Sequence, residues 1–173
     1  MKPVIPLCLW ELVTEKFGKD TWNVIKETAG FGVNTFLFAH DDIPDQQVFA
    51  LVEATCKTLD ISFEQAADVF GEYWVTSFAP RVYPGYLGKA SSARSLLSMM
   101  PEIHQSATEN IPNARPPRFD LSWEDENTLI MKYISERPLI DFAVGLTKGV
   151  GVYFGEPLHV TKLDSGAIKV VFL

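Results

Sequence analysis

The most informative stretch of this chain about its fold and function is Tyr133-Ile134-Ser135-Glu136-Arg137. In an extended strand, alternate side chains point to one face, so Tyr133, Ser135 and Arg137 would present a phenol, a hydroxyl and a guanidinium together. Such a face offers hydrogen-bond donors and one permanent positive charge. It suits a ligand with two carboxylates. Taken alone, alternating polar residues are also typical of a strand face exposed to solvent.

His104 lies about thirty residues upstream, in a segment with the pattern of a helix that Pro101 would open. A neutral imidazole on a helix can bind a metal. An iron porphyrin would use both features, because its metal takes an axial base and its two propionates take donors. By itself, a histidine in this setting is more often structural than a ligand. His40 and His159 have no partner nearby in the sequence.

Composition indicates one domain of 173 residues, 47% hydrophobic and 12% aromatic, with enough apolar side chains for a sizeable core. The net charge is −7 and no Lys/Arg cluster occurs, which argues against nucleic acid as a partner. Cys8 and Cys56 are expected to be free thiols in a reducing cytosol. No signal peptide, membrane-spanning stretch or catalytic motif is evident. We expect a cytoplasmic protein that is neither an enzyme nor bound to a membrane.

Periodicity predicts a helical N-terminal part followed by a sheet. Asp20 is expected to cap the second helix, Ser62-Phe63-Glu64-Gln65 to form a capping box, and Pro80 and Pro84 to break the chain. Glycines in the last helix predict close packing against another segment. The predicted helices cover residues 3–17, 21–29, 45–59, 62–78, 90–100, 101–110 and 138–154, with a loop at 36–44. The predicted strands cover 119–124, 128–135, 159–163 and 168–172, with a turn at 125–127.

With these residues in hand, the chain resembles the heme nitric oxide/oxygen binding (H-NOX) family, the domain shared by bacterial gas sensors and soluble guanylate cyclase. The resemblance runs over the whole chain. The matching segments, in the family's order, are Met1-Lys2, Phe17-Gly18-Lys19-Asp20-Thr21-Trp22, Phe70-Gly71-Glu72-Tyr73-Trp74, Ile103-His104, Pro116-Pro117-Arg118-Phe119, the Tyr-x-Ser-x-Arg motif, and Phe154-Gly155-Glu156-Pro157.

This resemblance implies an α+β fold, in which a helical N-terminal part packs on a four-stranded antiparallel sheet with helices and heme b (iron protoporphyrin IX) lies between them. The chain would be one domain, residues 1–173, with subdomains at about 1–65 and 66–173. His104 would be the proximal iron ligand, and Pro117 would press on the porphyrin and bend it. Tyr133, Ser135 and Arg137 would hold the propionates. Residues resembling the distal wall are Ile5, Leu9, Trp74, Val75, Phe78, Phe142 and Leu146.

Two departures from the family pattern bear on the expected ligand. Oxygen-binding members carry a distal tyrosine where this chain has Phe142, which offers no hydrogen-bond donor. Nitric oxide and CO depend on such a donor much less than oxygen does, so the sequence favours a sensor of NO and CO. Trp74 leaves oxygen binding open, because its indole N–H is a donor. The zinc site of some relatives is not expected, since no cysteine follows Cys56.

The resemblance implies that NO binding releases His104 from the iron, after which the heme relaxes. We expect no output domain after Leu173, so the signal would pass to a separate partner, a histidine kinase or a cyclic-di-GMP enzyme. One alternative is a non-heme module that binds another acidic small molecule or acts as a scaffold. A heme enzyme with redox activity is a further alternative, although no distal acid/base pair is evident.

Overall fold

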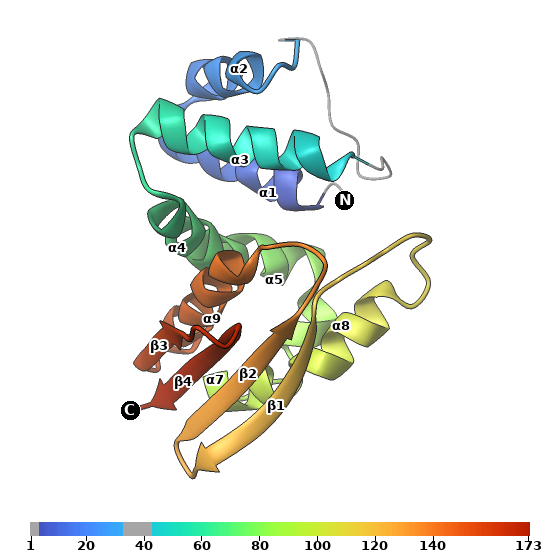
Figure 1. The fold of residues 1–173 in the computed structure, drawn as a ribbon, viewed down its shortest axis with the longest axis vertical. Helices are drawn as coiled ribbons and strands as arrows, with labels where there is room; N and C mark the ends of the chain where they lie inside the picture. Colours follow the sequence, from blue (N-terminus) through green and yellow to red (C-terminus); the bar gives the residue numbers. More distant parts are fainter. Residues whose placement is uncertain (1–3, 33–42) are drawn as a thin grey trace. The chain divides into compact units, whose positions relative to one another are not determined.

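The computed structural model describes residues 4–32 and 43–173, which form two compact units, Met1–Ala66 and Ala67–Leu173 (Figure 1). His40 and most of the predicted loop at 36–44 lie outside the described residues. The assignment of both units to a single domain stays a prediction.

The first unit contains the helices α1 (Val4–Phe17), α2 (Lys19–Thr28) and α3 (Asp45–Leu59). The prediction that Asp20 caps α2 is wrong. Gly18 precedes the helix with φ at 88°, a left-handed conformation that favours glycine, so α2 begins at Lys19. Asp20 lies in the first turn, where its negative charge suits the helix dipole.

Helix α4 (Phe63–Tyr73) begins at the predicted capping box. The amide of Gln65 donates to Ser62 Oγ (3.1 Å) and the amide of Ser62 donates to Gln65 Oε1 (2.8 Å). Beyond Tyr73 the chain widens into a π-helix, η1 (Trp74–Phe78). Single π-helical turns are rare and often occur at functional sites.

The predicted break at Pro80 is wrong, whereas the one at Pro84 is confirmed, because Tyr83, with φ at −131° and ψ at 47°, interrupts the helical run just before Pro84. Pro80 lies in the first turn of α5 (Ala79–Val82), and Pro84 begins α6 (Pro84–Leu87). Proline is tolerated in a first turn because the backbone N–H that it lacks has no partner within the helix there.

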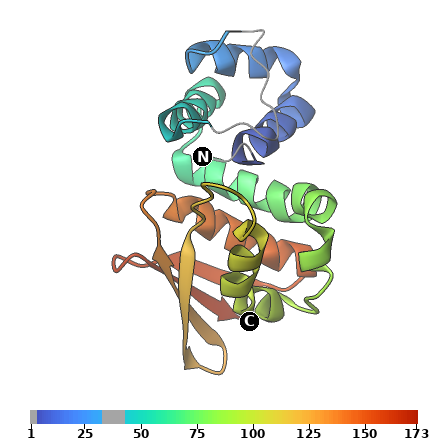
Figure 2. The same cartoon turned by 90° about the vertical axis from the view of Figure 1, so that its right-hand side faces the viewer.

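Two further helices lead to the sheet, α7 (Ala93–Ser98) and α8 (Met100–Thr108). Helix α7 is shorter than predicted because Ser92 caps it, accepting a hydrogen bond from the amide of Ser95 at 3.0 Å. Helix α8 carries His104 and runs beside the β1–β2 hairpin, contacting β1 (Figures 1 and 2).

The sheet is antiparallel, with the strand order β1-β2-β4-β3. Its strands are β1 (Arg118–Asp125), β2 (Thr128–Ile134), β3 (Leu158–Lys162) and β4 (Ala167–Phe172), and α9 (Ile140–Phe154) connects β2 to β3. The predicted α+β fold with a four-stranded antiparallel sheet is confirmed. No helix in the described part of the chain has the length and apolar character needed to cross a membrane.

One face of the sheet forms the core of the second unit. On β2, Leu129 and Met131 are buried, whereas Lys132, on the opposite face, is exposed. Side chains from α7, α9 and β4 belong to the same apolar cluster, among them Leu96, Leu97, Ala143, Val150, Ile168 and Val170. By strand alternation, Tyr133 shares the face of Leu129 and Met131.

Glycines let α4 and α9 cross in backbone contact, which confirms the predicted close packing. A Cβ atom built on Gly71 would lie 2.1 Å from the carbonyl carbon of Gly145. One built on Gly145 would lie 2.0 Å from the carbonyl oxygen of Ala67. No larger residue fits at this crossing. Helix α9 also contacts η1, which follows α4 directly.

Candidate functional site

The sequence predicted that the Tyr-x-Ser-x-Arg motif lies within one extended strand. In the structure the motif instead spans the end of β2. Tyr133 is in the strand, which ends at Ile134, and the chain then bends. Ser135 Oγ accepts a hydrogen bond from the amide of Arg137 (3.1 Å), and the Tyr133 hydroxyl donates to the carbonyl of Arg137 (3.2 Å). Local hydrogen bonds therefore bring the three residues together.

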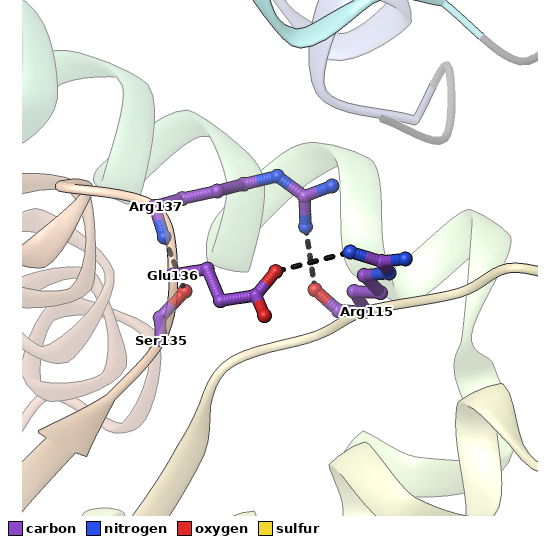
Figure 3. A network of polar contacts seen from close by, with 4 residues as sticks. All are labelled: Arg115, Ser135, Glu136 and Arg137. Carbon is purple, nitrogen blue, oxygen red and sulfur yellow. Dashed lines mark hydrogen bonds and ion pairs between the residues drawn. The ribbon is translucent and has the colours of Figure 1, made fainter.

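Arg115, in the segment before β1, lies beside this motif and faces Glu136 and Arg137 (Figure 3). Nη1 of Arg137 donates to the carbonyl oxygen of Arg115 (2.6 Å). Nη1 of Arg115 in turn pairs with Oε2 of Glu136 (3.1 Å). The two segments border a pocket of about 450 Å³, which is lined by Arg115, Pro116, Ile134, Ser135, Glu136 and Arg137.

His104 is half-buried on α8, and its ring is fixed by the segment that precedes β1. Its Nδ1 lies 3.0 Å from the carbonyl oxygen of Pro117. A carbonyl only accepts hydrogen bonds, so a neutral His104 carries its proton on Nδ1 and keeps the lone pair on Nε2. That is the tautomer that a metal bound at Nε2 requires.

The surroundings also favour the neutral form of His104. Burial lowers the pKa of its imidazole; the hydrogen bond to Pro117 opposes this, and the charge of Arg118 adds to it. The net direction is downward, so the ring is uncharged at neutral pH. A neutral imidazole is a competent metal ligand, whereas an imidazolium is not.

Phe119 connects His104 to the motif. Its ring centroid lies 5.4 Å from that of His104 and 5.8 Å from that of Tyr133. Phe119 and Tyr133 are direct partners in the β1–β2 register. The histidine and the first residue of the motif therefore both pack against one buried ring.

An aromatic cluster surrounds the π-helix. The ring of Trp74 lies 5.1 Å from that of Phe78 and 5.7 Å from that of Phe70. Phe142 of α9 meets Phe70 edge to face at 5.0 Å, and Tyr83 lies 6.5 Å from Trp74. Val75, Phe78 and Phe142 are buried, while Trp74 and Leu146 are half-buried. The predicted wall residues of the second unit thus lie on two elements in contact, η1 and α9.

The remaining predicted residues lie elsewhere. Ile5 and Leu9 are on α1 in the first unit, and their part in the site stays a prediction. His159 is exposed on β3. Among the described residues, no three His, Cys, Asp or Glu side chains gather closely enough to hold a metal ion.

The chemical groups of these residues fit an iron porphyrin. They comprise a neutral imidazole with its lone pair on Nε2, hydroxyl and guanidinium groups beside a pocket, and a cluster of aromatic rings. An axial ligand, partners for two carboxylates and an apolar surface are what this group needs.

Comparison with known families bears on the same point. The model of the family described as Haem-NO-binding (HNOB) matches residues 2–162. The chain belongs to this family. It is a family of heme-binding gas-sensor domains, the H-NOX domains, related to soluble guanylate cyclases.

Two curated relatives of the H-NOX chain are soluble guanylate cyclases of Caenorhabditis elegans, gcy-32 and gcy-34. Each is 23% identical to it over 150 residues, covering 81% of this chain and 21% of the relative. The chain therefore spans about a fifth of the length of the curated relatives it matches.

Solved H-NOX structures share the fold. A structure on the mechanism of H-NOX activation matches with a TM-score of 0.86, at 20% identity, over 99% of this chain and 96% of the other. An oxygen-binding H-NOX domain in its oxygen complex gives 0.81 at 20% identity, over 99% and 95%. The I5F mutant of the T. tengcongensis H-NOX gives 0.83 at 20% identity, over 99% and 97%.

Sequence reasoning did not assign roles to four residues of this candidate site. Phe119 and Phe70 lie in segments that resemble the family, but their contacts depend on the tertiary fold. Tyr83 follows a proline-containing stretch that was predicted to be broken. Arg115 carried no signal beyond its charge and its place before two prolines.

Proposed function

We propose that this H-NOX chain is a heme-based sensor of nitric oxide that also binds CO. The observation that carries the proposal is the hydrogen bond from His104 Nδ1 to the Pro117 carbonyl, which leaves Nε2 as the metal-binding nitrogen. Ferrous heme b would supply an iron atom at which a diatomic gas binds. Membership of a family described as Haem-NO-binding supports the same ligand.

The residues that would hold the cofactor divide by chemistry. His104 would bind the iron, and Tyr133, Ser135 and Arg137 would bind the propionates through hydroxyl and guanidinium groups. Pro117 would press on the porphyrin, a role supported by its position next to the His104 ring. The distal wall would consist of Ile5, Leu9, Trp74, Val75, Phe78, Phe142 and Leu146.

Selectivity for NO over oxygen would come from the distal wall. Bound oxygen carries partial negative charge and gains from a hydrogen-bond donor, whereas NO and CO need one much less. Phe142 is buried against Phe70 and offers no donor. Trp74 has an indole N–H, so oxygen binding through Trp74 is the alternative that a spectrum in air tests.

Signalling would begin at His104. Binding of nitric oxide to the iron would release His104 from it. Helix α8 would no longer be tethered to the cofactor, and Pro117 would no longer press on it. The imidazole of His104 would keep its hydrogen bond to the carbonyl of Pro117, so α8 and the segment before β1 would move together. The ligand thereby biases a two-state element.

The output would pass to a partner protein, a histidine kinase or a cyclic-di-GMP enzyme. Resemblance to bacterial H-NOX proteins is what supports this partner class. The guanylate cyclase relatives indicate that H-NOX domains also occur within larger proteins, since this chain covers 21% of their length.

Absorption spectroscopy tests the proposal. The reduced protein should show a heme Soret band and form a five-coordinate complex with NO. His104→Ala should lose heme or need added imidazole to retain it, because it removes the axial ligand and leaves the other donors in place. A preparation that stays colourless when hemin is supplied would contradict the proposal and favour a non-heme binding module.

A further inference from the structure

The pocket beside the motif holds more charge than the motif itself provides. Its walls are the segment at Arg115 and Pro116 and the bend that follows β2. Arg137 contributes one permanent positive charge and Arg115 a second, while Glu136 contributes the opposing negative charge (Figure 3). A ligand with two carboxylates is matched by two cations, one more than the motif contains.

We propose that Arg115 is a second cationic contact for the carboxylates of the bound porphyrin, and that Glu136 pairs with Arg115 until that ligand arrives. The inference rests on the proposed function, because it takes the porphyrin as the ligand. It adds a specificity-determining residue outside the Tyr-x-Ser-x-Arg motif and a counter-ion inside it.

The backbone of Arg115 is already held at the pocket. Nη1 of Arg137 donates to its carbonyl oxygen at 2.6 Å, so the main chain of one arginine is fixed by the guanidinium of the other. The side chain of Arg115 extends from this anchored point towards Glu136 (Figure 3). A guanidinium is planar and presents paired donors, the geometry that a carboxylate accepts in two parallel hydrogen bonds.

Exchange of partners costs Arg115 little. The pair of Arg115 with Glu136 is exposed, with 71% and 82% of the two side-chain surfaces accessible. Exposed ion pairs contribute little to stability, because water and salt screen them. A porphyrin carboxylate held beside the half-buried Ser135 and Arg137 would therefore displace the Glu136 carboxylate from Arg115. A ligand reaches the Arg115 guanidinium only by displacing the Glu136 carboxylate. Ligands with a single weak charge compete poorly with this carboxylate, so the pair selects against them.

The test compares zinc protoporphyrin IX with its dimethyl ester, which has the same ring and no carboxylate. Both are titrated by fluorescence into the full chain after extraction of its cofactor, for wild type, Arg115→Gln and Glu136→Gln. The matched control is Lys132→Gln, which removes one exposed positive charge from β2 at a residue that does not line the pocket.

Arg115→Gln should weaken binding of the diacid roughly tenfold, the size expected for one charge-assisted hydrogen bond, and should leave the ester unchanged. Arg115→Lys should recover part of the loss. Glu136→Gln should strengthen diacid binding, and Lys132→Gln should change neither ligand. Equal binding of the diacid by Arg115→Gln and wild type, or an equal loss for diacid and ester, would overturn this inference alone. A wild-type protein that binds neither porphyrin would overturn the proposed function, and this inference with it.

Discussion

His104 and Pro117 are linked through a single hydrogen bond, from Nδ1 of the imidazole to the carbonyl oxygen, at 3.0 Å. The bond joins α8 to the segment that enters β1. It fixes the orientation of the ring and the nitrogen that remains available, and it uses a backbone acceptor that no substitution of Pro117 removes. The position of His104 therefore depends on the path of the chain before β1.

The lowered pKa of His104 predicts how the cofactor-free protein responds to acid. In the unfolded chain the imidazole titrates near 6.5, and in the folded protein it titrates lower because of burial. The unfolded state therefore binds more protons between these two values, so stability is full above about pH 6.5 and falls as the pH drops towards the folded pKa. Urea unfolding between pH 7.5 and 5 measures this loss. His104→Gln should show a shallower loss, and an identical slope in both proteins would contradict the prediction.

Phe142→Tyr should give the heme-loaded protein a stable oxygen complex. The substitution adds a hydroxyl to a ring that packs edge to face on Phe70, and one hydrogen bond to bound oxygen should slow its dissociation about tenfold. Phe142→Leu is the control, because it changes the packing without adding a donor. The measurement is the spectrum of the reduced protein in air and the rate of oxygen release. If the wild-type protein already holds oxygen, Trp74→Phe should abolish that complex. A Phe142→Tyr protein that releases oxygen as fast as wild type would refute the role given to Phe142.

Local patterns in the sequence were enough to predict many elements. The capping box at Ser62 and Gln65 works through hydrogen bonds three residues apart, so its outcome needs no tertiary information. Helix α3 was predicted with the bounds that the structure has, Asp45–Leu59. The last hairpin turns at Asp164-Ser165-Gly166, where Gly166 has φ at 77°, as the turn residues indicated.

Features that depend on contacts between distant segments could not be predicted. The π-helix at Trp74–Phe78 follows a stretch with ordinary helical periodicity, and it packs on α9 beside the glycine crossing. The alternation of polar residues predicted an extended strand through Arg137. The chain instead bends after Ile134, because Ser135 Oγ accepts a hydrogen bond from the amide of Arg137. Ser and Thr side chains compete with regular structure in this way. The pairing of Arg115 with Glu136 spans two segments whose approach only the sheet determines.

Gly145→Ala should destabilise the protein by about 2 kcal/mol or more, because the added methyl group meets backbone atoms that cannot move aside. The new Cβ would lie 2.0 Å from the carbonyl oxygen of Ala67, which forces α4 and α9 apart. Gly85→Ala is the matched control, since nothing lies within 4 Å of a Cβ built there. Urea unfolding measures both variants. Equal stability of Gly145→Ala and Gly85→Ala would contradict the close crossing.

Arg94→Ala should destabilise the second unit by about 1–2 kcal/mol through loss of stacking and of two hydrogen bonds. The Arg94 guanidinium lies 4.7 Å from the ring centroids of both Trp123 and Phe172. It also donates to the carbonyl of Glu126 (2.6 Å) and to Asn127 Oδ1 (3.1 Å), so it ties α7 to the β1–β2 turn. Arg94→Lys keeps the charge but loses the planar fork, and should recover less than half of the loss. Full recovery by lysine in thermal unfolding would show that charge alone matters.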